Sequence, residues 1–546
     1  MTETLADLSS DVSIAWSSFA PEIAMTTAVV ILLLLTIAGR RRMWVATPLG
    51  LGIAAVGVWL VAAGSSVGGL VALVGGLGLI AATFGLAGAP RALHAWIAGG
   101  GVAAALVLTV WIAFDVLAVG DGQMAATSTM AGSLAVDGVA VFTRVTVYLT
   151  TLMVIPLGHA YLGDHGIHRP EFEPLLLLSA TGMALFGAAN DLITIFVALE
   201  ILSIALYVLA GIARRDRRSQ EAATKYFVMG AVASALLLYG FALTYVVTGT
   251  LDLADIATQL SQLDIPLRLA AVSMVLVLVG IGFKVALVPL QLWTPDVYQG
   301  APSNVTAFMG AATKAAAFAA MLRLLLVAYA PLSDMWVPVL AVMAALSMVY
   351  GAYTALRQTD VKRILAYSAI AHAGYATIGV VSLSNEGLTA TLWYLLTYAI
   401  TTIAGFGVII AVERTHERLV TVHDLRGLGT TSPALAGMFA VALLSLAGIP
   451  PTIGFVGKLT VFTAGVEAGL TWLVVIGVVS SVVAAAYYLR LMVVMFVEKP
   501  GDDAVEPAYS TGWNIASVAA VVLVVYLGLQ PQYLLDFAER AAGLVR

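Results

Sequence analysis

Cysteine is absent from the 546 residues, and charged side chains are scarce. Without cysteine the chain has no disulfide, no thiolate nucleophile and no cysteine-ligated zinc or iron–sulfur site. Charged residues make up 10% of the sequence, against about 25% in soluble proteins. Hydrophobic residues make up 61%, and so few charged side chains cannot cover that much apolar surface in water. The composition therefore indicates an integral membrane protein and excludes an ordinary soluble enzyme, a nucleic-acid binder and a secreted disulfide-stabilised domain.

Motifs for cofactors are also missing. The seven histidines are scattered, with no HExxH pattern and no close pair on one helix face. There is no GxxxxGK[ST] loop and no convincing GxGxxG after a strand. Residues 1–20 are acidic and lack the basic start of a secretory signal peptide, so we expect no cleaved leader. We expect no redox centre, no nucleotide site and no metal site in this chain.

Long apolar runs predict membrane-spanning helices. A helix needs about 20 apolar residues to cross the hydrocarbon core, whereas barrel strands would alternate with period two over about ten residues. The count of about 14–16 spans depends on how the glycine-rich stretch 64–100 is divided. The sixteen candidate segments are 21–39, 44–64, 67–88, 93–118, 139–162, 174–190, 191–213, 222–249, 267–300, 303–329, 336–356, 362–383, 388–412, 434–467, 471–497 and 511–530.

Lysine and arginine are unevenly distributed between the two sets of loops. If the N-terminus lies outside, the cytoplasmic loops hold sixteen of the 26 basic residues. The opposite loops and ends hold only Arg268, Arg323, Arg540 and Arg546. Basic residues favour cytoplasmic loops, so we expect a multi-pass protein of the cytoplasmic (inner) membrane with its N-terminus outside.

Five charged residues lie inside or at the edge of predicted spans. A charge at mid-bilayer costs roughly 2.5–3.5 kcal/mol, and such residues usually mark an ion or proton path. Two plainer interpretations stay open. Lys225 is near a segment start and could extend to the membrane surface, and Glu200 could form a static ion pair with a lysine. The five are Glu200, Lys225, Lys284, Lys314 and Lys458.

Three further polar residues fall in or near apolar segments. His372 is a lone histidine within 362–383. Taken alone, such a histidine is more often a hydrogen-bonded core residue than a functional one. Arg144 and Arg323 lie nearer to segment ends, where we expect them to act as interfacial anchors.

Two segments, 267–300 and 434–467, are too long for one simple span and contain proline and glycine. Proline removes a backbone donor and clashes with the preceding turn, so we expect each helix to be interrupted. Interrupted helices at membrane depth are tolerated where they are buried in protein or line a polar cavity. The prolines are Pro289 and Pro295 in the first segment and Pro450 and Pro451 in the second.

The interrupted segments occupy matching places in the chain. Each is the fourth segment of a block of five, and consecutive blocks of five must have opposite orientations because five is odd. Lys284 lies just before the first break, and Lys458 lies just after the second. Paired interrupted helices in inverted halves indicate a transport site. We therefore expect an all-α polytopic membrane protein with two inverted five-helix repeats, 174–330 and 336–497.

Three motifs carry a family resemblance: GFKVALVPLQLWTPDVYQGAP, IAHAGY at 370–375 and SLAGIPPTIGFVGK. They closely resemble the N-type subunits of the proton-pumping NADH:quinone oxidoreductases (respiratory complex I), whose broader family includes Mrp-type antiporter subunits. The resemblance covers about 136–531. The family usually has fourteen helices, so the helices in 1–135 are either an N-terminal extension or an overcount. By the same resemblance, 136–173 is a helix leading into the core, and 498–546 is a C-terminal loop and last helix.

The resemblance implies a proton relay. Lys284 and Lys458 resemble the lysines of the family's two broken helices, and Lys458 favours the N type because the M type usually has glutamate there. The bacterial pattern often has histidine where this chain has Gln291, which cannot titrate. Any relay must use water or Lys314 at that point. The implied relay residues are Glu200, Lys225, Lys284, Lys314, His372 and Lys458.

A glutamate beside a lysine could control this relay. Desolvation disfavours the charged amine, and a nearby carboxylate restores it. At 4 Å and an effective dielectric of about 20, the pair interaction is about 4 kcal/mol. Making or breaking such a contact would turn a lysine from a proton holder into a donor. We expect Glu200 to pair with Lys225 or Lys284, followed by hops through Lys314, His372 and Lys458.

The resemblance also implies that the energy comes from other chains. A peripheral arm would oxidise NADH through FMN and iron–sulfur clusters and reduce quinone, and this subunit would bind none of these cofactors. Its partners would be the antiporter-like M and L subunits, the small K and J subunits, the peripheral arm and the lipid bilayer, with no nucleic acid. Two alternatives stay open: a subunit of an Mrp-type Na⁺/H⁺ antiporter, and a structural spacer whose charges are locked in static pairs.

Overall fold

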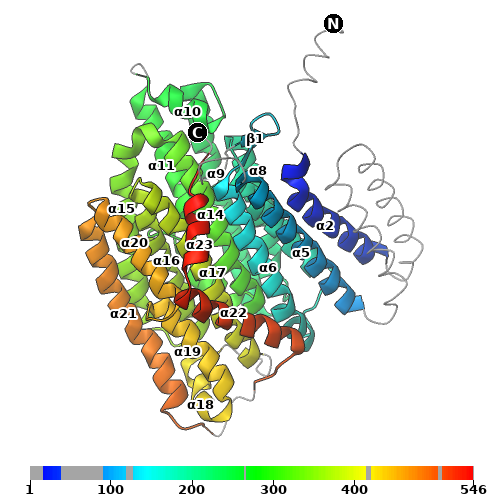
Figure 1. The fold of residues 1–546 in the computed structure, drawn as a ribbon. Coiled ribbons are helices and arrows are strands. Elements are labelled where there is room, and N and C mark those ends of the chain that lie inside the picture. The colour runs from blue at the N-terminus through cyan, green and yellow to red at the C-terminus, as the bar shows by residue number, and fades with distance from the viewer. Residues whose placement is uncertain are drawn as a thin grey trace.

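The structure, a computed structural model, describes residues 16–38, 90–117, 127–262, 266–413, 420–501 and 507–544. Helices dominate this part of the chain and run side by side, with α2 and α5 at one edge of the bundle and α21 at the opposite edge (Figure 1). Within these residues, eleven helices are long and apolar enough to cross a membrane, and shorter apolar helices accompany them. The prediction of an all-α polytopic membrane protein is confirmed. The predicted segments 44–64 and 67–88 lie outside the described residues.

The elements before the second predicted repeat are η1 (Trp16–Phe19), α2 (Ala20–Ala38), α5 (Pro90–Leu117), β1 (Thr127–Thr129), β2 (Leu134–Val136), α6 (Gly138–Asp164), α7 (Phe172–Ala188), α8 (Leu192–Ala210), α9 (Arg217–Thr248), α10 (Leu253–Leu260), α11 (Leu267–Val285), α12 (Trp293–Gly300), α13 (Ser303–Phe308), η3 (Met309–Thr313), α14 (Lys314–Arg323) and η4 (Leu324–Ala328). The remaining elements are η5 (Ala330–Leu332), α15 (Ser333–Ala355), α16 (Val361–Val381), α17 (Asn385–Glu413), η6 (Val422–Leu425), α18 (Leu428–Thr431), α19 (Pro433–Ala447), α20 (Ile453–Glu467), α21 (Thr471–Phe496), α22 (Thr511–Leu529) and α23 (Gln532–Arg540).

Aspartate side chains begin several of these helices. A carboxylate at the N-cap accepts a hydrogen bond from a backbone N–H that has no partner inside the helix. The N–H groups of Ala140, Thr194 and Arg363 are satisfied in this way. The capping residues are Asp137 for α6, Asp191 for α8, Asp216 for α9, Asp252 for α10 and Asp360 for α16.

The two predicted repeats share a local pairing at the start of their second helix. Before α8, Asp191 forms an antiparallel bridge with Asp252, and before α16, Asp360 forms one with Thr421. The bridged residues are separated by the same number of positions in both repeats. This recurrence supports the division into two repeats, while the predicted boundaries, 174–330 and 336–497, remain a prediction.

Both predicted helix interruptions are present. The first leaves Pro289 in the gap between α11 and α12, and the indole N–H of Trp293 spans that gap to the carbonyl of Phe283 at 2.9 Å. Pro295 lies in the first turn of α12, where its missing N–H needs no partner, so the prediction that it breaks the helix was wrong. The second gap lies between α19 and α20 and contains Pro450 and Pro451.

Two arginines expected at the membrane interface are buried instead. Arg323 forms a two-armed ion pair with Asp137, at 2.6 and 2.9 Å, and donates to the carbonyl of Gly187 at 2.7 Å. Arg144 pairs with Glu22 of α2 at 2.6 Å. Both side chains are enclosed, because α6 and α14 lie inside the bundle. The prediction that Arg144 and Arg323 anchor the chain at the membrane interface was therefore wrong. Their positions near segment ends do not show which helices pack around them.

The Arg323–Asp137 pair yields a stability prediction. Replacing one partner of a buried ion pair leaves a buried charge without compensation and costs about 3–5 kcal/mol. We expect Arg323→Met to lower the thermal stability of the purified membrane assembly, measured by fluorescence-detected size-exclusion chromatography after heating. Arg268→Met, at an exposed position, is the matched control. Equal stability of the two variants would contradict the assignment.

Candidate functional site

The six predicted relay residues fall into two groups. Lys284, Lys314, His372 and Lys458 are buried, with 4–6% of each residue exposed. They come from α11, α14, α16 and α20, two of which flank the helix interruptions. The other two, Glu200 and Lys225, lie nearer to the surface of the bundle.

Lys284 lies in the last turn of α11 and is held by hydroxyl groups. Its amine donates to Ser203 Oγ at 2.8 Å and to the Tyr226 hydroxyl at 3.4 Å, and lies 5.5 Å from the centre of the Tyr226 ring. Ser203 lies one turn after Glu200 on α8, and Glu200 is close enough to Lys284 to interact with it electrostatically. The structure therefore brings Glu200 and Lys284 near each other without a direct ion pair.

Glu200 is directed toward the outside of α8. It lines an apolar hollow between α7 and α8 with Leu178, Val197 and Ile204, whose side chains are exposed. Its Oε1 atom is buried and has no hydrogen-bond partner among the described residues. A buried carboxylate oxygen is costly unless a hydrogen-bond donor, from water or from a neighbouring chain, reaches it.

Lys225 belongs to a surface network. Its amine pairs with Glu221 at 2.6 Å and Asp296 at 2.7 Å, and Asp296 also accepts from Arg363 at 2.7 Å. The half-buried Asp296 carboxylate is satisfied by these two cations, since Lys225 and Arg363 each donate a hydrogen bond to it at 2.7 Å. Lys225 thus ties α9 to α12 and has Asp296, rather than Glu200, as its long-range partner.

Lys314 and His372 share a tyrosine. The Lys314 amine donates to the backbone carbonyl of Ala369 on α16 and lies 5.5 Å from the centre of the Tyr398 ring. The same ring lies 4.9 Å from the imidazole of His372, centre to centre. Lys314 directly follows the π-helical turn η3, a distortion that is frequent at functional sites.

The imidazole of His372 is bounded by hydroxyl groups. Its Nδ1 lies 2.7 Å from the Tyr394 hydroxyl and its Nε2 3.4 Å from the Tyr488 hydroxyl. A tyrosine hydroxyl can donate or accept, and each imidazole nitrogen can do either according to its proton. His372 is therefore a hydrogen-bonded core histidine by geometry and also has the partners that proton transfer requires.

Lys458 lies at the second helix interruption. Its amine donates to the carbonyl of Ala447 at 2.9 Å and to Ser481 Oγ at 2.7 Å. Ala447 is the last residue of α19, so the interruption frees a carbonyl at the helix end where a cation is favoured. Gly448 follows in the left-handed region at φ 81°, and an added Cβ there would lie 2.7 Å from the Lys458 side chain. The break therefore supplies both the acceptor and the space for Lys458.

Aromatic rings lie beside the three buried amines, and these rings were not predicted from the sequence. The centre of the Tyr375 ring lies 5.0 Å from the Lys458 amine and 5.5 Å from the centre of the His372 ring. Beside Lys284, the Tyr226 ring stacks on the Trp293 ring with 4.7 Å between ring centres. The centres of the Trp293 and Tyr298 rings are 6.2 Å apart. Tyrosines in apolar helices look like ordinary core residues in a sequence, and only their packing shows that Tyr398 and Tyr375 lie between His372 and the two lysines Lys314 and Lys458.

A second buried polar cluster was also missed. Glu413, at the end of α17, lies 3.5 Å from the Lys362 amine and accepts a hydrogen bond from Ser303. Lys362 also donates to the carbonyl of Ala301 at 3.0 Å. Both charged residues lie at predicted segment ends, which made them look like loop residues, although about 5% of each is exposed.

Gln291 lies in the gap between α11 and α12. It is buried, and its Oε1 has no hydrogen-bond partner among the described residues. The neighbouring hydroxyl of Thr294 is also buried without a partner among them. The gap is therefore polar but lacks a titratable side chain at the position of the family histidine.

The chain matches known proteins over most of its length. The family "NADH:quinone oxidoreductase/Mrp antiporter, TM" matches residues 189–484. NADH-quinone oxidoreductase subunit N of Trichlorobacter lovleyi is 42% identical over 425 residues, covering 77% of this chain and 86% of that protein. A chain of respiratory complex I from Thermus thermophilus with bound aureothin is 38% identical, with a TM-score of 0.68, covering 81% of this chain and 92% of that chain.

A chain of the Mrp complex from Dietzia sp. DQ12-45-1b superimposes with a TM-score of 0.75 over 97% of each chain, but its identity of 23% shows a shared fold alone. Higher identity separates the subunit N proteins from it. The chain belongs to the subunit N family of the NADH-quinone oxidoreductases.

Proposed function

We propose that this chain translocates protons across the membrane as a non-redox subunit of an NADH:quinone oxidoreductase. The observation that carries the proposal is the environment of Lys284, Lys314 and Lys458. The ion pairs of the described residues include none of these three lysines, whose partners are hydroxyls, carbonyls and aromatic rings. A spacer with charges locked in static pairs would show the opposite arrangement.

These environments suit amines that gain and lose protons. A buried lysine without a carboxylate is close in free energy between its charged and neutral forms, because desolvation opposes the charge. A hydroxyl partner can hydrogen-bond to the charged or to the neutral amine, since a hydroxyl both donates and accepts. Tyr398 and Tyr375 would then connect Lys314, His372 and Lys458 into one pathway.

The energy and several partners would come from outside this chain. NADH, FMN, iron–sulfur clusters and quinone would be bound by other subunits, and the M, L, K and J types and the peripheral arm would be its neighbours. Glu200 supports a neighbour at the α7–α8 face, because its unpartnered oxygen lies in an apolar hollow there. A charge approaching Glu200 from that neighbour would change its influence on Lys284.

The orientation proposed for the chain follows its arginines. The loop between α8 and α9 carries Arg214 and Arg215, and Arg169 lies at the same end. We place this end on the cytoplasmic side of the inner membrane, which puts the N-terminus outside. An Mrp-type Na⁺/H⁺ antiporter subunit is the alternative function, and copurification with NADH dehydrogenase subunits distinguishes the two.

Lys314 gives the first functional prediction. Lys314→Ala should reduce NADH-driven proton pumping about tenfold or more while the complex still assembles, because an acid–base group is removed. Lys314→Arg should fail as well, since arginine stays charged. Pumping is measured by fluorescence quenching in inverted membrane vesicles, with Lys499→Ala at an exposed position as the control. Normal pumping in Lys314→Arg would show that only the charge is needed and would reject the relay.

Glu200 gives the second functional prediction. Glu200→Gln keeps the shape of the side chain but removes its charge, so we expect slower NADH-driven pumping with an unchanged amount of complex. The matched control is Glu386→Gln, at an exposed position at the start of α17. If both variants pump at the parent rate, Glu200 has no part in the coupling.

A further inference from the structure

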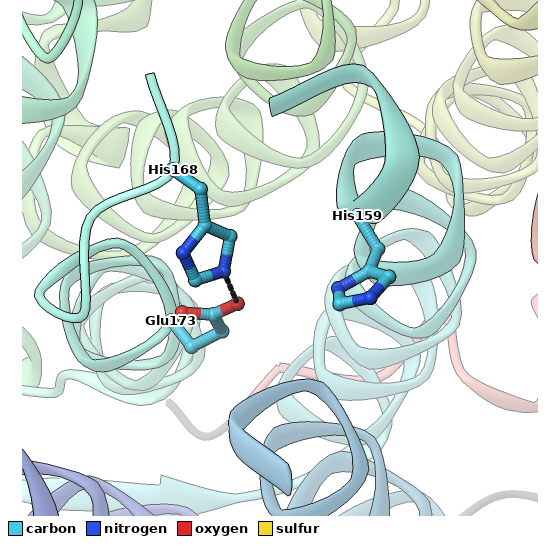
Figure 2. Close-up of side chains that lie close together, drawn as sticks. All are labelled: His159, His168 and Glu173. Carbon is cyan, nitrogen blue, oxygen red and sulfur yellow. Dashed lines mark ion pairs between the residues drawn. The ribbon is translucent and has the colours of Figure 1, made fainter. Parts of the chain in front are cut away.

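Three metal-ligating side chains converge at the end of α6, away from the relay lysines. They are His159 on α6, His168 in the loop before α7 and Glu173 in the first turn of α7. One ligand atom of each lies within 4.8 Å of those of the other two. Figure 2 shows His168 and Glu173 in contact, with His159 facing them from its own helix. The sequence does not predict this cluster, because His159 lies on a helix and His168 in the loop that follows it.

The contacts within this cluster are incomplete. His168 Nε2 lies 3.3 Å from Glu173 Oε1, and the rings of His159 and His168 stand nearly perpendicular at 6.1 Å. The side chains of His168 and Glu173 are only 6% and 3% exposed. Among the described residues, Glu173 Oε2 has no hydrogen-bond partner, and His168 Nε2 makes no hydrogen bond besides its 3.3 Å approach to Glu173 Oε1. Buried polar atoms left in this state are costly unless something binds them.

We propose that His159, His168 and Glu173 bind a divalent transition-metal ion of the zinc type. Two imidazoles and one carboxylate are donors that Zn²⁺ prefers, at about 2.0–2.2 Å, which places tetrahedral ligand atoms roughly 3.4 Å apart. The three ligand atoms lie within 4.8 Å of one another, so binding an ion would require the side chains to draw together by about 1 Å or somewhat more. Ca²⁺ and Mg²⁺ prefer oxygen ligands, so the two imidazoles select against them. Solvent would occupy the fourth position.

Bound metal would hold the loop between α6 and α7. In that loop His165 Nε2 lies 3.1 Å from the backbone carbonyl of Glu413, the residue that pairs with Lys362. Tyr161, one turn before His165 on α6, approaches the N–H of Ser303 at 3.5 Å. The ion would therefore stiffen a segment that touches the buried Lys362–Glu413 cluster, and it would do so without entering the proposed proton pathway.

Zinc content of the assembled complex tests the site. The complex is purified through a tag without histidine, treated with chelator, incubated with Zn²⁺, desalted and analysed by mass spectrometry for metal. We expect His168→Asn and Glu173→Gln each to retain one zinc fewer per complex than the parent and to weaken uptake at that site at least tenfold. His423→Asn, at an exposed histidine in η6, should behave as the parent. Equal zinc content and affinity in parent and both variants would overturn the proposal.

A second measurement decides the matter if a variant fails to assemble. Hydrogen–deuterium exchange of the parent complex is followed over residues 160–175 with and without Zn²⁺. We expect exchange in this stretch to slow several-fold with Zn²⁺ and to stay unchanged with Mg²⁺. Unchanged exchange with Zn²⁺, or equal slowing with both ions, would rule out a zinc-type site here.

Discussion

The cost of a lysine charge inside an apolar bundle is the constraint on which this structure depends. That cost is roughly 2.5–3.5 kcal/mol on insertion scales. Elsewhere in the bundle charge is neutralised by direct pairing, as in Arg323 with Asp137. The three buried relay lysines are treated differently, since hydroxyls and carbonyls surround them instead of carboxylates. The bundle thus has one set of buried charges neutralised by direct ion pairs and a second set, the predicted relay lysines, whose partners are hydroxyls and carbonyls.

The helix interruptions follow from the same constraint. The last carbonyls of a helix have no partner inside that helix, so an interrupted helix can offer them to a buried amine. The break after α19 exposes the carbonyl of Ala447 to Lys458, and the gap after α11 places Gln291 and Thr294 in the interior. The fold therefore provides polar groups inside an apolar bundle without adding charge.

Much of this arrangement could be predicted from the sequence, because its signals are strong. Lys284 and Lys458 stand out because they are lysines in apolar segments. Both helix interruptions could be predicted because prolines occur in segments that are too long for one span. What the sequence could not show was which helices surround a residue. Arg144 and Arg323 were therefore expected at the membrane interface. Tyr375 and Tyr398 could not be told from ordinary core residues. The histidines of the proposed metal site were missed because only the course of the loop between α6 and α7 brings His168 beside His159.

The number of protons moved per NADH oxidised shows directly whether the buried lysines carry protons during turnover. It is measured on the complex reconstituted in vesicles, with Lys458→Arg in place of the parent chain. Arginine keeps the positive charge beside Ala447 but does not release a proton. The account predicts a lower proton-to-NADH ratio, or loss of turnover, in complexes that assemble normally. An unchanged ratio at unchanged turnover would contradict it.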